Sequence, residues 1–219
     1  MTKEPSKKCA KPADAGGKSA KQRYTPRPYL SFSQMDLFER DPAEFVRRYI
    51  HGDKVDSDAM SLGREVHAYI ENEKDTSRPE FDAIRALVPR YDRHEYEVKA
   101  MLDEVPLLGR LDGFNGKGRI EIADVKTGKK WTQAMAHRSD QLTFYALLVM
   151  LATGLVPDRL LIHWVETARD EDGTLRITGN VRTFVTSRTK TQIFAFAPRV
   201  AAAWRGIQEL YTREVNAIL

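Results

Sequence analysis

IEIADVK, residues 120–126, is a β-rich segment in which charged side chains interrupt an apolar pattern. Side chains alternate between the two faces of a strand, so Asp124 and Lys126 share one face, and Ala123 and Val125 lie on the other. Hydrolysis of a phosphodiester requires a hard cation, oxygen ligands for that cation and a group that orients or deprotonates water. An Asp-x-Lys strand supplies two of these requirements, although the pattern alone is common.

A second carboxylate, Asp112, lies upstream in GRLDGF, residues 109–114, among Leu108, Leu111 and Phe114. A carboxylate in a segment inclined to burial needs a hydrogen-bonding partner or a metal. One interpretation is a strand-end aspartate that accepts hydrogen bonds from backbone amides of the glycine-rich turn. The other is a metal ligand that acts together with Asp124.

The turn between these two segments decides whether the acids can meet. A two-residue turn at Asn115-Gly116 would pair Asp112 with Arg119 and leave Asp124 roughly 17 Å away along the strand. We therefore expect a turn nearer Gly118, or a bend at Gly113, that brings Asp112 and Asp124 together.

The remaining chain predicts an α/β protein. Ser33 is the expected N-cap of a first helix, with Asp36 three residues later and a break at Asp41-Pro42. The spacing of apolar residues then predicts helices over 60–74 and 80–88, followed by strands over 95–102, 105–114 and 118–126. A long helix over 133–153, capped by Thr132, comes next. Strands over 159–168 and 175–187 and a helix over 190–218 that Pro198 would interrupt complete the chain.

Composition excludes several classes of protein. The chain has 219 residues, of which 42% are hydrophobic and 30% charged, and no apolar run approaches the length of a membrane span. Cys9 is the only cysteine, so neither a disulfide framework nor a thiolate cage for zinc or an iron-sulfur cluster is expected. No secretory leader is apparent, so we expect a cytoplasmic protein.

The positive charge is concentrated at the N-terminus. Residues 1–30 carry eight basic side chains against Glu4 and Asp14, a net charge of +6, so the rest of the chain holds about −2 of the total of +4. Large apolar side chains are almost absent there, which predicts a disordered basic tail over residues 1–28 and an ordered domain over 29–219. The tail either keeps the protein soluble or holds DNA nearby by releasing counterions, and both can hold together.

Three further polar residues have two interpretations each. His67 lies on the apolar face of its predicted helix, where a histidine is either a hydrogen-bonded core residue or a ligand. Gln141 and Tyr145 are four residues apart and therefore share a helical face. Taken alone, they would be read as an interface pair.

Together these segments closely resemble the RecB-type branch of the PD-(D/E)XK nucleases. The resemblance covers most of the chain from Leu30 to about Tyr145, and its ordered set of motifs is far more specific than any single one. The segments are SFSQMDLFERDP (31–42), LGREVHAYI (62–70), LLGRLDGF (107–114), IADVKTG (122–128) and DQLTFYALL (140–148).

The resemblance implies a restriction-endonuclease-like core, a central mixed β-sheet flanked by helices, and a Mg²⁺-dependent deoxyribonuclease in which Mn²⁺ can substitute. It implies catalytic roles for Asp112, Asp124 and Lys126, with Lys126 positioning or activating water. Its implied metal ligands are His67, Asp112, Asp124 and the Val125 carbonyl. Gln141 and Tyr145 match a Q-x-x-x-Y element that looks toward the DNA backbone and braces the site.

The chain departs from some members of this branch. Asp41 stands where iron-sulfur members have a cysteine before the proline, so the resemblance is to cluster-free members. No helicase segment is present, which suggests a stand-alone nuclease or one that joins a helicase or recombination partner in trans. The expected activity is that of an exonuclease or flap-processing enzyme in DNA repair or recombination. The alternatives are a catalytically idle DNA-binding or scaffolding domain and a metal-dependent hydrolase of another substrate.

Overall fold

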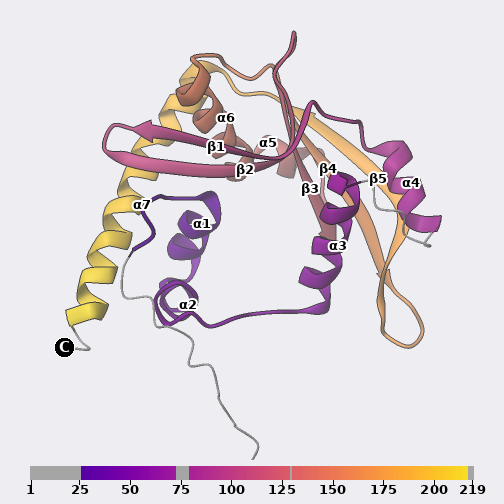
Figure 1. The fold of residues 1–219 in the computed structure, drawn as a ribbon, viewed down its shortest axis with the longest axis horizontal. Coiled ribbons are helices and arrows are strands. Elements are labelled where there is room, and N and C mark those ends of the chain that lie inside the picture. The colour runs from indigo at the N-terminus through magenta and orange to yellow at the C-terminus, as the bar shows by residue number, and fades with distance from the viewer. Residues whose placement is uncertain (1–25, 73–78, 129, 217–219) are drawn as a thin grey trace, which may run out of the picture.

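The computed structural model describes residues 26–72, 79–128 and 130–216, and their elements form a sheet covered by helices (Figure 1). None of the helices in these ranges is both long and apolar enough to cross a bilayer. The elements are α1 (Phe32–Arg40), α2 (Pro42–Phe45), the π-helix η1 (Val46–His51), α3 (Asp58–Asn72), α4 (Pro79–Leu87), β1 (Arg93–Leu102), β2 (Val105–Asn115), β3 (Glu121–Gly128), α5 (Gln133–His137), α6 (Asp140–Thr153), β4 (Arg159–Arg169), β5 (Leu175–Thr186) and α7 (Lys190–Asn216).

The five strands form one mixed sheet in the order β1-β2-β3-β4-β5. The pair β3 and β4 is parallel and the other three neighbouring pairs are antiparallel. Parallel neighbours need a crossover connection, which α5 and α6 provide. The α/β class and the mixed sheet flanked by helices are therefore confirmed.

The sheet separates two apolar clusters because its side chains alternate between faces. On one face Ile122 of β3 packs in a cluster with α1, α6 and α7. On the other face Ala123 and Val125 pack with Leu62 and Val66 of α3 and with residues of α4. The period-2 pattern of IEIADVK thus holds in the structure. Residues Leu142–Met150 of α6 are all buried, as expected of a helix that is apolar on every side.

Three local predictions were wrong. The first helix is capped at Ser31 rather than Ser33, because Gln34 Oε1 accepts hydrogen bonds from both the amide and the hydroxyl of Ser31. The predicted long helix over 133–153 is two helices, α5 and α6, since Ser139 caps α6 by accepting from the Leu142 amide. Arg188 donates to the carbonyls of Ala136 and Ser139, which satisfies backbone groups exposed by this break.

Other boundaries follow the prediction closely. Asp41 separates α1 from α2 and caps α2 by accepting from the Glu44 amide, with Pro42 in the first helical turn. Thr132 caps α5 and Gly154 ends α6. The third wrong prediction concerns the C-terminal helix: α7 runs through the exposed Pro198 without the predicted interruption. The predicted basic tail over residues 1–28 lies almost entirely outside the described residues.

Candidate active site

Asp112 and Asp124 meet where β2 separates from β3. The two strands pair only at Gly113 with Ala123, Phe114 with Ile122 and Asn115 with Glu121, so the next position in this register sets Asp112 opposite Asp124. The connecting turn contains Gly118 at a φ of 73°, which confirms the expected turn near this glycine. Beyond Gly113, Asp112 Oδ2 accepts a hydrogen bond from the Val125 amide at 2.6 Å. One carboxyl oxygen is thus satisfied by the backbone of β3 rather than by the glycine-rich turn, and the other is left for a different partner.

Gln141 of α6 connects the side chains of Asp124, Lys126 and Tyr145 by hydrogen bonds. Its Nε2 donates to Asp124 Oδ1 at 2.8 Å and to the Tyr145 hydroxyl at 2.9 Å, and its Oε1 accepts from Lys126 Nζ at 2.8 Å. Lys126 Nζ also lies 2.8 Å from Asp124 Oδ2. The Q-x-x-x-Y pair therefore holds the Asp-x-Lys pair in place.

His67 approaches Asp112 from α3, on the opposite side of the two acids. Gly63 lets α3 lie close to β3, because a Cβ at this position would be 3.3 Å from Thr127 Oγ1. His67 Nδ1 lies 3.5 Å from Asp112 Oδ1 and 3.5 Å from Glu95 Oε1. His67, Glu95 and Asp112 are the group in the described chain whose ligand atoms all lie within 4.8 Å of one another.

Glu95 was missed in the sequence analysis. Its neighbours His94 and Tyr96 pair with Gly113 and Leu111, so Glu95 faces Asp112 across the hairpin. Its φ of 46° is unusual for a residue other than glycine, and such backbone strain concentrates at functional sites. The sequence did contain a signal for Glu95, because a two-residue turn at Asp103-Glu104 sets positions 95 and 112 opposite each other.

The site places three carboxylates, Glu95, Asp112 and Asp124, close to two basic groups, His67 and Lys126. Burial, and next the negative charge of Asp124, raise the pKa of Asp112 to about 7. Burial lowers the pKa of His67, but its hydrogen bond to Glu95 and the charge of Asp112 outweigh burial, so this pKa is raised. Asp124 is only 2% exposed, and its Oδ2 receives no hydrogen bond despite the nearby ammonium of Lys126.

These donors fit a divalent cation. Carboxylates with a free oxygen and an imidazole are ordinary ligands of such ions, and a bound cation would relieve the repulsion between Asp112 and Asp124. Of the predicted ligands His67, Asp112, Asp124 and the Val125 carbonyl, the first two lie in one close group, together with Glu95. In the conformation described, Asp124 contacts Lys126 and Gln141 and lies outside the closest group of three.

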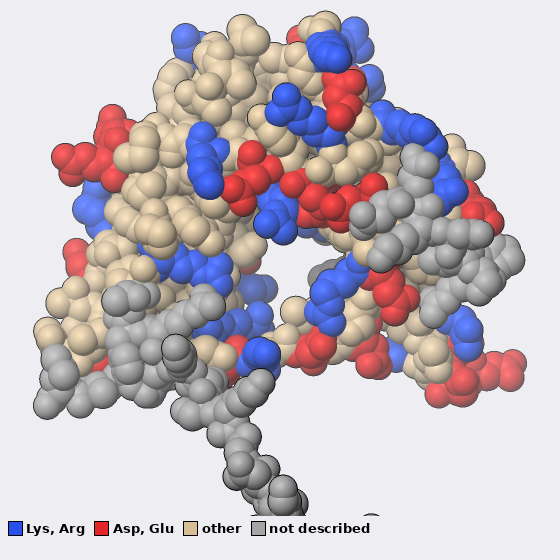
Figure 2. Space-filling model, viewed as in Figure 1, with Lys and Arg blue, Asp and Glu red and all other residues tan. Residues whose placement is uncertain are grey.

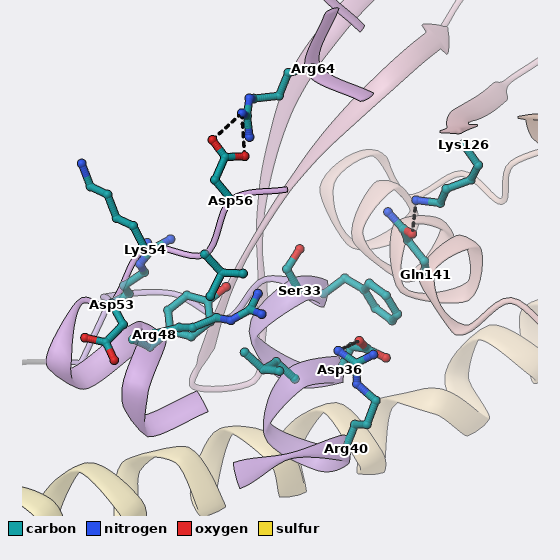
Figure 3. A pocket seen from close by; sticks show the side chains of 15 residues that line it. Ser33, Asp36, Arg40, Arg48, Asp53, Lys54, Asp56, Arg64, Lys126 and Gln141 are labelled. Carbon is teal, nitrogen blue, oxygen red and sulfur yellow. Dashed lines mark hydrogen bonds and ion pairs between the residues drawn. The ribbon is translucent and has the colours of Figure 1, made fainter. Parts of the chain in front are cut away.

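A cleft of about 670 Å³ opens beside Lys126 and Gln141 (Figure 3). Its other walls come from α1, from η1, from the segment between η1 and α3, and from α3. Six basic and three acidic side chains line it, namely Arg27, Arg40, Arg48, Lys54, Arg64 and Lys126 against Asp36, Asp53 and Asp56. The cleft is thus more positive than the chain beyond residue 30 as a whole, and it leads directly to the polar network.

Solved structures share this fold at low sequence identity. A candidate exonuclease from Eubacterium rectale aligns with a TM-score of 0.52 at 14% identity, covering 85% of this chain and 82% of that one. The LHK-Exo alkaline exonuclease of Laribacter hongkongensis, in complex with dAMP, aligns with a TM-score of 0.51 at 12% identity, covering 88% and 95%. Curated protein sequences give no significant match. A sequence model of the PD-(D/E)XK nuclease superfamily matches residues 82–217, which include β1 to α7 and the aspartates of the site. The chain therefore belongs to the PD-(D/E)XK nuclease superfamily.

Proposed function

We propose that this protein is a Mg²⁺-dependent DNA nuclease of the RecB-type branch, with Mn²⁺ able to substitute. One observation carries the proposal: Asp124, which is buried, and Asp112, which is partly buried, lie on adjacent strands and meet beside a lysine held by Gln141. A purely structural pair of aspartates would leave their repulsion unrelieved. The domain would comprise residues 29–219, and the basic segment 1–28 would add salt-sensitive attraction to DNA.

His67, Asp112, Asp124 and the Val125 carbonyl would hold the cation, and Glu95 is close enough to be a further ligand. When bound, the cation supplies positive charge that stabilises the pentavalent phosphate and lowers the pKa of water. Asp112 Oδ1 lies 3.5 Å from His67 Nδ1, and Asp124 Oδ2 lies 2.8 Å from Lys126 Nζ. The Val125 amide fixes the orientation of Asp112 through its hydrogen bond.

Lys126 has an electrostatic role in this proposal. Burial lowers the pKa of Lys126, but the negative charge of Asp124 outweighs burial and raises it, so the amine is protonated at neutral pH. A protonated amine orients water or hydroxide through its hydrogen bonds and stabilises charge on the transition state, but it does not accept a proton. Gln141 fixes its direction, and Tyr145 supports Gln141 from the next helical turn.

The expected reaction is exonuclease or flap cleavage in DNA repair or recombination in the cytoplasm, alone or with a helicase or recombination partner in trans. Both neighbours above are described as exonucleases, and one is in complex with dAMP, a deoxynucleotide. We expect no iron-sulfur cluster, because a single cysteine cannot hold one. Purified protein should accordingly be colourless.

The decisive experiment is degradation of labelled DNA in Mg²⁺, Mn²⁺, Ca²⁺ and EDTA by the wild-type chain and by Asp112→Ala and Asp124→Ala. We expect cleavage in Mg²⁺ and Mn²⁺, binding with little turnover in Ca²⁺, and none in EDTA or in either variant. Retained DNA binding without cleavage by the wild type would identify the alternative, an idle DNA-binding domain. Substantial cleavage by either variant would refute the assignment of the two acids.

A further inference from the structure

Tyr91 is buried between α4 and β1, and it lies outside the cleft of the candidate active site. In the space-filling view, charged side chains of both signs border the opening at the centre of the molecule (Figure 2). Tyr91 belongs instead to the apolar cluster on the sheet face that α3 and α4 cover, together with Ala123 and Val125 of β3. It therefore packs against the strands of the site from the interior of the protein.

The ring of Tyr91 packs against Gly113, the residue that follows Asp112 in β2. A Cβ atom on Gly113 would lie 2.4 Å from Cδ2 of Tyr91 and 2.7 Å from its Cε2 and Cγ. Only glycine therefore lets the ring lie this close to β2. Gly113 pairs with Ala123, and beyond this pair β2 separates from β3. The ring thus lies at the point where the two strands part.

The hydroxyl of Tyr91 reaches past β3 to β4. It lies 2.6 Å from Nε2 of His163, and Nδ1 of His163 lies 2.8 Å from the hydroxyl oxygen of Thr183 on β5. His163 pairs with Val125 of β3, so the side chain of Tyr91 extends from β2 across β3 to β4. Burial lowers the pKa of His163 to about 4, so the imidazole is neutral, and one ring nitrogen donates while the other accepts. Both hydroxyl groups can therefore form a hydrogen bond with it.

Tyr91 also contacts β1 beside Glu95. Its amide donates to Nε2 of His94 at 3.4 Å, and the centroids of the two rings are 5.9 Å apart. The neighbours in sequence of two candidate ligands thus contact the same residue, since His94 precedes Glu95 and Gly113 follows Asp112. A close-packed interior transmits small displacements, so a shift of Tyr91 would move both ligands.

We propose that Tyr91 is a positioning residue of the candidate metal site, because its ring and hydroxyl fix the point at which β2 leaves β3. This point decides whether Asp112 Oδ2 reaches the Val125 amide, 2.6 Å away, and whether Asp112 and Glu95 lie close enough to share a cation. Tyr91 itself touches neither the cation nor the substrate. The proposal rests on the cation site of the proposed function, and it adds a buried residue on which the geometry of that site depends.

Hydrogen exchange of the Val125 amide tests the positioning without metal or DNA. In the full-length chain in EDTA, Tyr91→Leu removes the ring and should weaken the hydrogen bond from this amide to Asp112. Exchange at Val125 should then become about tenfold faster relative to the amides of β4, the effect of losing one hydrogen bond. Phe81→Leu is the matched control, since it removes a ring of the same cluster that packs against Tyr69, and it should leave this ratio unchanged. An unchanged ratio in Tyr91→Leu would overturn the proposal.

Calorimetric titration with Mn²⁺ tests the consequence for the metal site. Tyr91→Leu should bind Mn²⁺ at least about tenfold more weakly than the wild type, as expected when a residue that orients metal ligands is lost. Phe81→Leu should bind like the wild type, although both variants lose thermal stability, and Tyr91→Phe, which keeps the ring, should retain most of the affinity. Equal Mn²⁺ affinities of Tyr91→Leu and Phe81→Leu would overturn the proposal. Absence of Mn²⁺ binding by the wild type would instead refute the cation site, and the exchange of the Val125 amide would still decide the role of Tyr91.

Gly113→Ala tests the same contact without removing a core side chain. The added methyl group would overlap the ring of Tyr91, so the ring or β2 has to move. Mn²⁺ affinity should fall in the wild-type background and fall less when Tyr91→Leu is already present, because the two residues act through one contact. Additive losses of affinity in the double variant would overturn the proposal.

Discussion

Replacing Asp112 with asparagine should stabilise the metal-free protein at neutral pH. Asp112 and Asp124 are adjacent, Asp124 is buried and Asp112 is partly buried, and the pKa of Asp112 is raised to about 7 by burial and by the charge of Asp124. Ionising this carboxyl therefore costs more free energy in the folded state than in the unfolded chain. Asparagine has nearly the same shape, carries no charge, and can still accept the hydrogen bond from the Val125 amide.

The size of the effect follows from the displaced pKa. A shift from 3.8 to about 7 corresponds to about 4 kcal/mol, at about 1.4 kcal/mol per unit. Because the folded pKa is raised, the stabilisation by a protonated Asp112 is complete below pH 3.8 and is lost as pH rises through about 7. Asp112→Asn should thus gain on the order of 4 kcal/mol at pH 8 and about 2 kcal/mol at pH 5.

Thermal unfolding in EDTA between pH 5 and 8 measures this difference. At about 2–4 °C per kcal/mol for a chain of this length, the variant should unfold about 10 °C above the wild type at pH 8, with a smaller gap at pH 5. Adding Mg²⁺ should narrow or reverse the gap, since the cation stabilises the wild type by binding its carboxylates. A variant less stable than the wild type in EDTA at pH 8 would refute the view that these carboxylates are arranged for a cation rather than for stability.

Three other predictions address separate residues. Lys126→Ala should lower the single-turnover cleavage rate by orders of magnitude while DNA affinity falls only modestly. Lys126→Arg should not restore the cleavage rate fully. An unchanged rate of Lys126→Ala at saturating DNA would make Lys126 a phosphate contact. Glu95→Gln should weaken Mn²⁺ binding about tenfold by calorimetry, whereas unchanged affinity would exclude it as a ligand. Burial lowers the pKa of His163 to about 4, so the neutral imidazole contributes about 3 kcal/mol to the free energy of unfolding above pH 6.5, and this contribution should be lost as pH falls toward 4. His163→Gln should remove this dependence of the free energy of unfolding on pH, measured from chemical unfolding curves. The same pH dependence in the variant would contradict the assignment.

The sequence by itself predicted the candidate site residues and most of the elements. Alternation in IEIADVK placed Asp124 and Lys126 on one face, because the period of a strand is a local property of the backbone. The caps at Asp41, Thr132 and Gly154 were also predictable, since capping depends on a few neighbouring residues. Gln141 and Tyr145 share a face for the same local reason.

Only the tertiary structure decided which of these residues meet. Short pairing between β2 and β3 sets Asp112 opposite Asp124, and register depends on where a turn begins and where two strands part. Glu95 enters the site through the register of a different hairpin. The break between α5 and α6 combines the local cap of Ser139 with hydrogen bonds from Arg188, about 50 residues away in sequence, which no local pattern predicts. Likewise, the segment that lines the cleft between η1 and α3 joins two helices that pack in separate clusters of the core. Contacts between distant segments depend on the packing of the whole chain, and local sequence patterns therefore do not predict them.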